Sequence, residues 1–372
     1  MVVNVVNSAQ TVADRYREFS WQQARGQSDA HEELTARISQ DAEFCDVLAG
    51  SLPAGNKQQP NLLLAAVRYL DGPHAEQGPH GEAAYGRWRE WTIRHWDEVR
   101  AVIMQRGTQT NEPARCATLL PLLARLPQPL ALLEVGTSAG LCLHPDRYRY
   151  RYEGGAEGHG HGAQEVGTPG SPVTFTCRTS RAAPPSADGP YAPAPGATAL
   201  PEIVWRGGID LDPLDPVDRV DDNRWLQALV WPGQRARADR LAAAVEAVRD
   251  APRPTLVRGD LIDELPALAA AAPREATLVI FHSTVLMYLS PARRAEFARL
   301  VRSILAERDG PGHWISNEHH TELPWITDPA HDALPPEYAH LLTLSLDEQP
   351  VALTGPHGQS LHWLREPDLR AG

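Results

Sequence analysis

The sequence lacks the cysteine and glycine spacings that would assign it to several common classes of protein. Its 372 residues include 4 cysteines, and none of them forms a CxxC pair, so neither a zinc knuckle nor a disulfide framework is expected. No metal site is predicted. The G-x-G-x-x-G spacing of a dinucleotide-binding turn is also missing, which counts against dinucleotide-dependent redox chemistry.

Long basic runs and long apolar runs are absent as well. The formal net charge is −12, which argues against binding to a phosphate backbone, so nucleic acid is not an expected partner. No stretch reaches the roughly 18 uninterrupted apolar residues that a membrane span needs, and the first residues, MVVNVVNSAQ, do not form a basic segment followed by an apolar core. We therefore expect a soluble cytoplasmic protein with a small-molecule substrate and no membrane partner.

The first third of the chain has a helical pattern. From about residue 10 to 126 the apolar positions recur with the helical period, and the clearest stripe contains Trp88, Trp91 and Trp96. Aromatic residues at this spacing most simply pack in a core, and the alternative is an aromatic wall for a ligand. Residues 1–127 are predicted to form an all-helical N-terminal region.

The pattern changes after Pro127. Residues 130–135 (LALLEV) form an apolar run, and the GTSAG that follows introduces a helix-like segment, as in a buried parallel strand entering a turn. Further strand-like runs, EIVWRGGIDL, TLVRGD, ATLVIFHS and HWISNE, are separated by helical stretches, which predicts a mostly parallel sheet. Residues 153–200 are rich in Gly, Ala and Pro and are predicted to be an insertion within a domain of residues 128–372. The end of the chain carries turn residues between short strands and predicts antiparallel hairpins at the sheet edge.

Polar residues follow several of these predicted strands. In an open parallel sheet the ligand lies beyond the carboxyl ends of the strands, so these positions are the candidate site. A carboxylate there, such as Asp210, can accept hydrogen bonds from both hydroxyls of a ribose. Asp260 can accept one from an adenine amino group while Leu261 covers the ring.

The order of these motifs resembles the class I S-adenosylmethionine-dependent methyltransferases. The chain has E-x-G-x-x-x-G at Glu134 to Gly140, then an acid, then G-D-L, then an apolar strand with the tail VLMYL. The strings QTNEPARCATLLP, PLALLEVGTSAGLCL and LTGPHGQSLHWL also resemble, nearly end to end, an uncharacterised actinobacterial family known as domain of unknown function DUF2332. The resemblance implies a Rossmann-like, mostly parallel sheet with S-adenosylmethionine as cofactor.

The resemblance also assigns roles to single residues. It implies that the cofactor is bound by the strand-tip residues Glu134, Gly136, Ser138, Gly140, Asp210, Asp260 and Leu261. Two features depart from the methyltransferase pattern. Ser138 stands where many of these enzymes have a glycine, and the distance from Gly136 to Asp210 far exceeds the usual ~20 residues.

Methyl transfer would require a proton acceptor near the substrate. His282 or Glu318 would remove a proton from an oxygen or nitrogen acceptor, although His282 can equally be a satisfied histidine under the sheet edge. The predicted substrate-binding residues are polar or aromatic side chains near the turn and the strand tips: Gln109, Asn111, Glu112, Arg115, Tyr288 and Asn317. The alternative for QTNEPAR is a helix cap, and for Asn317 and Glu318 a polar loop.

Two other functions remain open at this stage. Gly136 to Gly140 also satisfies G-x-S-x-G, so Ser138 can be the nucleophile of a serine hydrolase with Asp260 and with His282 or His357. The preceding helical residues argue against that fold. A methyltransferase-like fold can also catalyse a non-methylating reaction in specialised metabolism or bind a ligand without turnover.

Overall fold

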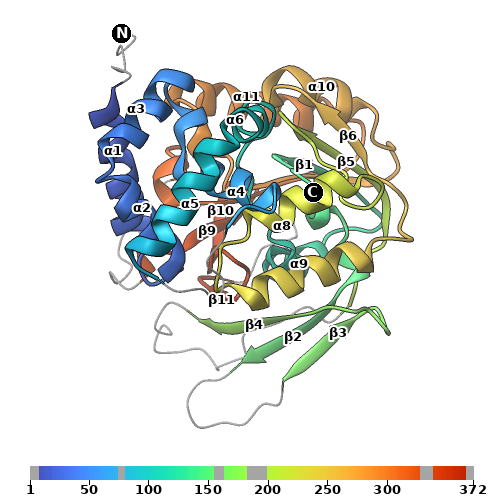
Figure 1. Ribbon diagram of the computed structural model, residues 1–372. Coiled ribbons are helices and arrows are strands. Elements are labelled where there is room, and N and C mark those ends of the chain that lie inside the picture. The colour runs from blue at the N-terminus through green and yellow to red at the C-terminus, as the bar shows by residue number, and fades with distance from the viewer. Residues whose placement is uncertain (1–7, 74–79, 155–162, 182–198, 327–337, 366–372) are drawn as a thin grey trace. The chain divides into compact units, whose positions relative to one another are not determined.

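The computed structural model describes residues 8–73, 80–154, 163–181, 199–326 and 338–365 (Figure 1). The chain divides into two compact units, which are Met1–Thr110 with Pro216–Ala242, and Asn111–Asp215 with Ala243–Gly372. This division differs from the sequence boundary at residue 127, because residues 111–127 group with the sheet. Within the described ranges, no helix combines the length and the apolar character needed to cross a membrane.

The first unit is built from helices that begin at favourable residues. Ser8, Ser28 and Asp41 each accept a hydrogen bond from a backbone amide in the first turn of a helix, and Pro60 occupies a first turn, where its missing amide costs nothing. These helices are α1 (Ala9–Phe19), α2 (Asp29–Ile38), α3 (Ala42–Ser51), α4 (Pro60–Tyr69), α5 (Glu82–Arg94) and α6 (Trp96–Gln105).

A later segment completes this unit. Residues 216–242 contain α8 (Val220–Leu229) and the start of α9 (Arg235–Ala247). Arg106 Nη1 donates to Asp222 Oδ1 at 2.6 Å, and Arg68 Nη1 donates to the carbonyl of Ala228 at 3.0 Å. The indole of Trp225 is buried and donates to the carbonyl of Gly107 at 3.2 Å. The first unit therefore consists of two stretches of chain that are far apart in the sequence.

The second unit contains an 11-stranded sheet in the order β3-β2-β4-β11-β10-β9-β8-β7-β1-β5-β6. Its strands are β1 (Leu130–Val135), β2 (Arg149–Gly154), β3 (Gln164–Gly167), β4 (Thr174–Arg181), β5 (Ile203–Asp210), β6 (Thr255–Arg258), β7 (Thr277–Ser283), β8 (Gly312–Glu318), β9 (Leu342–Leu346), β10 (Gln349–Thr354) and β11 (Ser360–Trp363). The run β6-β5-β1-β7-β8 is entirely parallel. The expected mixed α/β fold with a large, mostly parallel sheet is confirmed.

Helices on the sheet explain why its central strands are so apolar. All six residues of β1 are buried, as expected for a parallel strand covered on both faces. α10 (Leu261–Ala270) and α11 (Pro291–Glu307) pack on β1, β7 and β8 through a shared core that includes Leu133, Ile280, Leu265, Phe297 and Val301. α7 (Cys116–Leu123) is buried along its whole length.

Two expectations from the sequence are wrong. The C-terminal strands β9 and β10 are antiparallel as predicted, but they do not form the sheet edge. β11 pairs in parallel with β4, so β4, β2 and β3 continue the sheet beyond them. The supposed insertion thus contributes strands to the main sheet, while residues 155–162 and 182–198 lie outside the described part of the chain.

The second error concerns the segment after the glycine turn. The sequence predicts a helix there, but the chain forms two short 3₁₀ turns, Leu141–Leu143 and Pro145–Arg147, and then enters β2. Pro145 and the left-handed Gly140 (φ 67°) explain why no helix propagates through this segment. The glycine turn therefore does not lead into a long helix whose positive end would face a ligand.

Candidate functional site

The glycine turn, residues 136–140, folds back onto the end of the neighbouring strand β5. The amides of Gly136 and Thr137 both donate to the carbonyl of Ile209, at 2.8 and 3.0 Å. Gly136 has φ 74°, and a Cβ at this position would lie 2.3 Å from Val285 Cγ2. A glycine is required here because a protein side chain approaches it closely.

Asn111, Ser138 and Asp210 form one hydrogen-bonded network around the turn. The amide of Ser138 donates to Asp210 Oδ2 at 2.8 Å, and Asn111 Nδ2 donates to Ser138 Oγ at 2.6 Å. The amide of Ala139 donates to Asn111 Oδ1 at 3.0 Å. Asn111 therefore contacts the glycine turn directly instead of capping a helix, and Asp210 fixes the turn from the next strand.

Glu134 is a buried acid at the start of the turn. It is 7% exposed, and its Oε2 accepts a hydrogen bond from Thr137 Oγ1 at 2.7 Å. Burial raises the pKa of this carboxyl well above its usual value, the neighbouring Cys142 raises it further, and Arg115 opposes the shift. The environment favours the protonated form, in which the carboxyl can donate a hydrogen bond.

Arg115 joins the QTNEPAR segment to two other parts of the site. Its Nε donates to the carbonyl of Pro356 at 2.9 Å, and its Nη1 donates to the carbonyl of Ser283 at 3.1 Å. Glu112 is 3% exposed, and its Oε2 lies 3.5 Å from Nδ1 of His357. The segment thus packs against the turn between β10 and β11. Gln109 belongs to the first unit and is half-buried.

Asp260 lies at the same edge of the sheet as Asp210. The amide of Gly259 donates to the carbonyl of Asp210 at 3.0 Å, so the tips of β5 and β6 are neighbours. The Asp260 carboxylate caps α10 by accepting from the amide of Ile262 at 2.9 Å, and it forms an ion pair with Arg293. Leu261 is half-buried and packs against the core. The two acids are therefore close, as expected, but both bind protein groups.

His282 and Glu318 form a buried pair at the ends of β7 and β8. Trp314 Nε1 donates to His282 Nε2 at 3.0 Å, so Nδ1 carries the proton and donates to Glu318 Oε1 at 2.7 Å. Glu318 also accepts from the amide of Val285 at 2.9 Å. Both ring nitrogens are engaged, and His282 is 0% exposed. This geometry suits a positioning role, in which the pair holds Val285 against Gly136, better than proton exchange with a substrate.

Asn317 and Tyr288, two predicted substrate contacts, have opposite environments. Asn317 is 0% exposed, donates to Ser283 Oγ at 3.2 Å and accepts from Thr354 Oγ1 at 2.7 Å. Tyr288 is 73% exposed, like Leu211 at the tip of β5. Of the two predicted residues, Tyr288 is accessible to a ligand, and Leu211 is an accessible apolar side chain that sequence reasoning missed.

Strained backbone marks the ends of two adjacent parallel strands. Ser138, after β1, has φ 50°, and Thr284, after β7, has φ 57°. A residue other than glycine in this region costs of order 1–3 kcal/mol and persists where the surroundings hold it, often at functional sites. The carboxyl ends of β1 and β7 are therefore the candidate site of the second unit.

Sequence reasoning missed the residues that support this site. Val285 and Thr284 follow a predicted strand, but no residue pattern signals their conformation. The contacts of Trp314 with His282 and of Arg293 with Asp260 could be predicted only after the order of the strands in the sheet was known. Aligning the predicted strands HWISNE and ATLVIFHS as parallel neighbours would have suggested the first of these contacts.

Comparison with known proteins gives one match. The model of a family described as an uncharacterized protein conserved in bacteria (DUF2332) matches residues 13–363. No curated protein and no solved structure matches the chain. Because the match covers nearly the whole sequence, the chain belongs to the DUF2332 family.

Proposed function

We propose that the second unit is an enzyme of the S-adenosylmethionine-dependent methyltransferase type that acts on a small molecule. The observation that carries the proposal is the parallel run β6-β5-β1-β7-β8 with the glycine turn at the end of β1. Within this run, β5 and β6 extend the sheet on one side of β1, and β7 and β8, which come later in the chain, extend it on the other side. Ligands of open α/β sheets bind at such a switch point.

The residues at the strand tips fit a nucleoside better than they fit the methionine end of this cofactor. Asp210 is half-buried at the tip of β5 and already accepts from the amides of Ser138 and Asp212, and the exposed Leu211 that follows it suits an adenine ring. The turn itself is filled, because Val285 packs on Gly136, and Thr137, Ser138 and Ala139 are buried. The turn therefore does not fit the methionine end of the cofactor, and the proposal of methyl transfer rests on the strand order and the sequence resemblance.

Calorimetry with S-adenosylmethionine, S-adenosylhomocysteine and NAD tests this proposal. We expect both sulfur nucleosides to bind more tightly than NAD. Leu211→Glu should weaken their binding about tenfold by placing a charge beside the adenine ring. Val204→Glu is the matched control, since it changes an exposed residue near the other end of β5 and should leave binding unchanged. No binding of either sulfur nucleoside at millimolar concentration would contradict the proposal and favour a methyltransferase-like fold with other chemistry.

One observation favours a second candidate function, hydrolysis with Ser138 as nucleophile. The left-handed conformation of Ser138 in a G-x-S-x-G sequence after a buried strand resembles a nucleophile elbow. The side-chain amide nitrogen of Asn111 donates to Ser138 Oγ. This nitrogen cannot accept the serine proton and so cannot act as the general base. Hydrolysis of a p-nitrophenyl ester that is lost in Ser138→Ala and kept in Ser290→Ala would establish this function, and equal rates in both variants would exclude it.

A further inference from the structure

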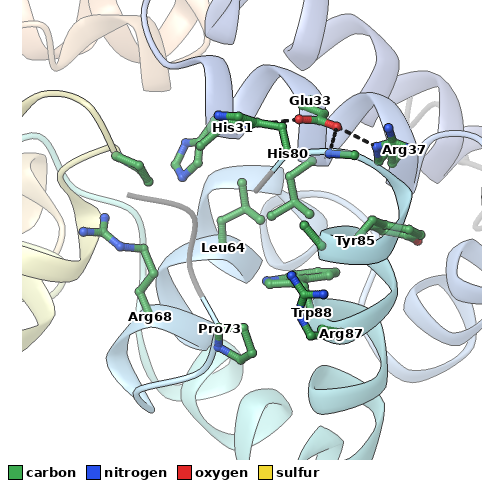
Figure 2. A pocket seen from close by; sticks show the side chains of 15 residues that line it. His31, Glu33, Arg37, Leu64, Arg68, Pro73, His80, Tyr85, Arg87 and Trp88 are labelled. Atoms are coloured by element: carbon green, nitrogen blue, oxygen red, sulfur yellow. Dashed lines mark hydrogen bonds and ion pairs between the residues drawn. The ribbon is translucent and has the colours of Figure 1, made fainter. Parts of the chain in front are cut away.

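The helical unit contains a cavity of about 240 Å³. Its walls come from α2, α4 and α5, with Pro73 and Pro232 (Figure 2). All of its lining residues belong to the first unit, so the cavity is separate from the strand-tip site.

His31 is the most unusual residue of the cavity wall. It is 3% exposed, and among the residues that the structure describes neither Nδ1 nor Nε2 has a hydrogen-bond partner. Figure 2 shows its ring beside Leu64 and Arg68, on the side of the cavity away from Trp88. Buried polar groups are nearly always hydrogen-bonded, because leaving them unsatisfied costs the full desolvation penalty. A histidine in this environment therefore indicates a partner that belongs in the cavity.

The imidazole offers two different hydrogen-bonding groups. Burial and the nearby charge of Arg68 lower the pKa of His31 to about 3, so the ring is neutral at neutral pH. A neutral imidazole has one N–H donor and one nitrogen acceptor. Its contact with Trp231 is between tilted rings at 5.3 Å and satisfies neither nitrogen. The matching ligand group is one that donates or accepts a hydrogen bond and carries no charge.

The charged side chains of Glu33 and Arg68 at the cavity are bound to other protein groups. Glu33 accepts from Arg37 Nε at 2.9 Å and from the amide of Gly81 at 2.7 Å, and His80 Nδ1 lies 3.0 Å from its carboxylate (Figure 2). Arg68 donates to the carbonyls of Ala228 and Val230. Most of the remaining wall is apolar: Ala30, Leu34, Leu64, Pro73, Ala84, Trp88 and Pro232.

Size and wall composition limit the ligand further. A dry cavity of about 150 Å³ in another protein binds benzene, so 240 Å³ has room for two fused rings. Trp88 is buried in the wall and provides an aromatic face. Trp88 would then be the one member of the tryptophan stripe that contacts a ligand.

We propose that this cavity binds a small, neutral aromatic molecule with a hydroxyl or ring N–H group, and that His31 forms a hydrogen bond with that group. The binding site is independent of the proposed methyl transfer. It gives the helical unit a recognition function of its own.

Binding of 2-naphthol and of naphthalene, measured by calorimetry on the full chain, tests the proposal. The wild type should bind 2-naphthol about tenfold more tightly, since the two molecules differ by the hydroxyl that meets His31. His31→Phe keeps an aromatic ring of similar size and should remove this difference. Ala84→Trp should fill the cavity and abolish both interactions. His95→Phe, which lies in the same unit but outside the cavity wall, is the control and should bind both compounds like the wild type.

A measurement on the wild type keeps the test independent of how the variants fold. Saturation with 2-naphthol should shift the ring ¹⁵N resonances of His31, whereas those of the buried His144 should not move. Equal affinity of the wild type for the two compounds, absence of binding, or unchanged His31 resonances would each overturn the proposal.

Discussion

The two candidate ligand sites differ in how their buried polar groups are satisfied. At the tips of β1, β5 and β8, the amides of the glycine turn and the carboxylates of Asp210 and Glu318 bond to other parts of the protein. In the helical cavity, His31 is buried, and its ring nitrogens bond to no other residue in the described part of the chain.

Buried polar groups that bond to other protein groups support the structure of a site, whereas a buried polar group without a protein partner can bind a ligand. His282 and His31 are both buried histidines, yet His282 holds Glu318 and accepts from Trp314. A glycine motif or a catalytic residue type therefore does not by itself identify a group that contacts a ligand.

Replacing Glu318 with Ala should destabilise the second unit by about 4 kcal/mol. The change leaves two buried donors, His282 Nδ1 and the amide of Val285, without their acceptor, and each costs ~1–3 kcal/mol. Urea denaturation followed by tryptophan fluorescence measures the loss. Glu348→Ala, which removes an exposed partner of Arg302, is the control and should cost less than ~1 kcal/mol. Equal losses of stability in Glu318→Ala and Glu348→Ala would show that the hydrogen bonds of Glu318 do not stabilise the second unit.

His31→Phe should make the protein more resistant to acid. The folded state binds a proton at His31 only near pH 3, whereas the unfolded chain does so near 6.5, so stability falls as the pH decreases between these values. The slope from this residue is about 1.4 kcal/mol per pH unit, and the variant should lack it. Urea midpoints at pH 7, 6 and 5 measure the slope, with His80→Phe as control. An unchanged slope would mean that a group in the cavity already stabilises the charged ring.

At neutral pH the same substitution should have opposite effects at the two histidines. His282→Phe removes an acceptor from Trp314 and a donor from Glu318 and should cost about 2 kcal/mol. His31→Phe removes a buried group that bonds to no described residue and should stabilise the ligand-free protein by about 1 kcal/mol. Urea denaturation of both variants in one buffer gives the sign of each change in the free energy of unfolding. If both substitutions destabilise the protein, the two histidines do not differ in the way proposed.

Relief of backbone strain should produce the smallest effect. Thr284→Gly frees a β-branched residue from φ 57° and should stabilise the protein by about 1 kcal/mol. Ser138→Gly gains the same relief but loses the bond from Asn111, so its net effect should be near zero. Thermal denaturation compares the two. Loss of stability in Thr284→Gly would show that the threonine side chain contributes more than its conformation costs.

The sheet was largely predictable because buried parallel strands are apolar and end in glycine or acidic residues. β1, β5, β7 and β8 all fall within strand-like runs of the sequence. The direction of the C-terminal hairpins was predictable too, but their place inside the sheet depends on β11 pairing with β4, a contact between residues 360–363 and 178–181 that no local pattern reveals.

The sequence predicted where the residues of the site lie better than it predicted what each side chain binds. The sequence brings Asp210 and Asp260 to one edge, but it does not say whether their carboxylates meet a ligand or the amides of Ser138 and Ile262. The cavity at His31 escaped detection for a related reason. Its walls come from separate helices and from Pro232, and a histidine at a helix start gives no sign of being buried.

The discontinuous first unit constrains how the polypeptide folds during its synthesis. Helices α1 to α6 emerge from the ribosome well before residues 216–242, whose Asp222 and Trp225 bond to Arg106 and Gly107. More than a hundred residues of the second unit are translated in between. During that time the apolar surfaces of the early helices that pack against residues 216–242 stay exposed. A nascent chain stalled before residue 216 should therefore be a ready substrate for chaperones and proteases.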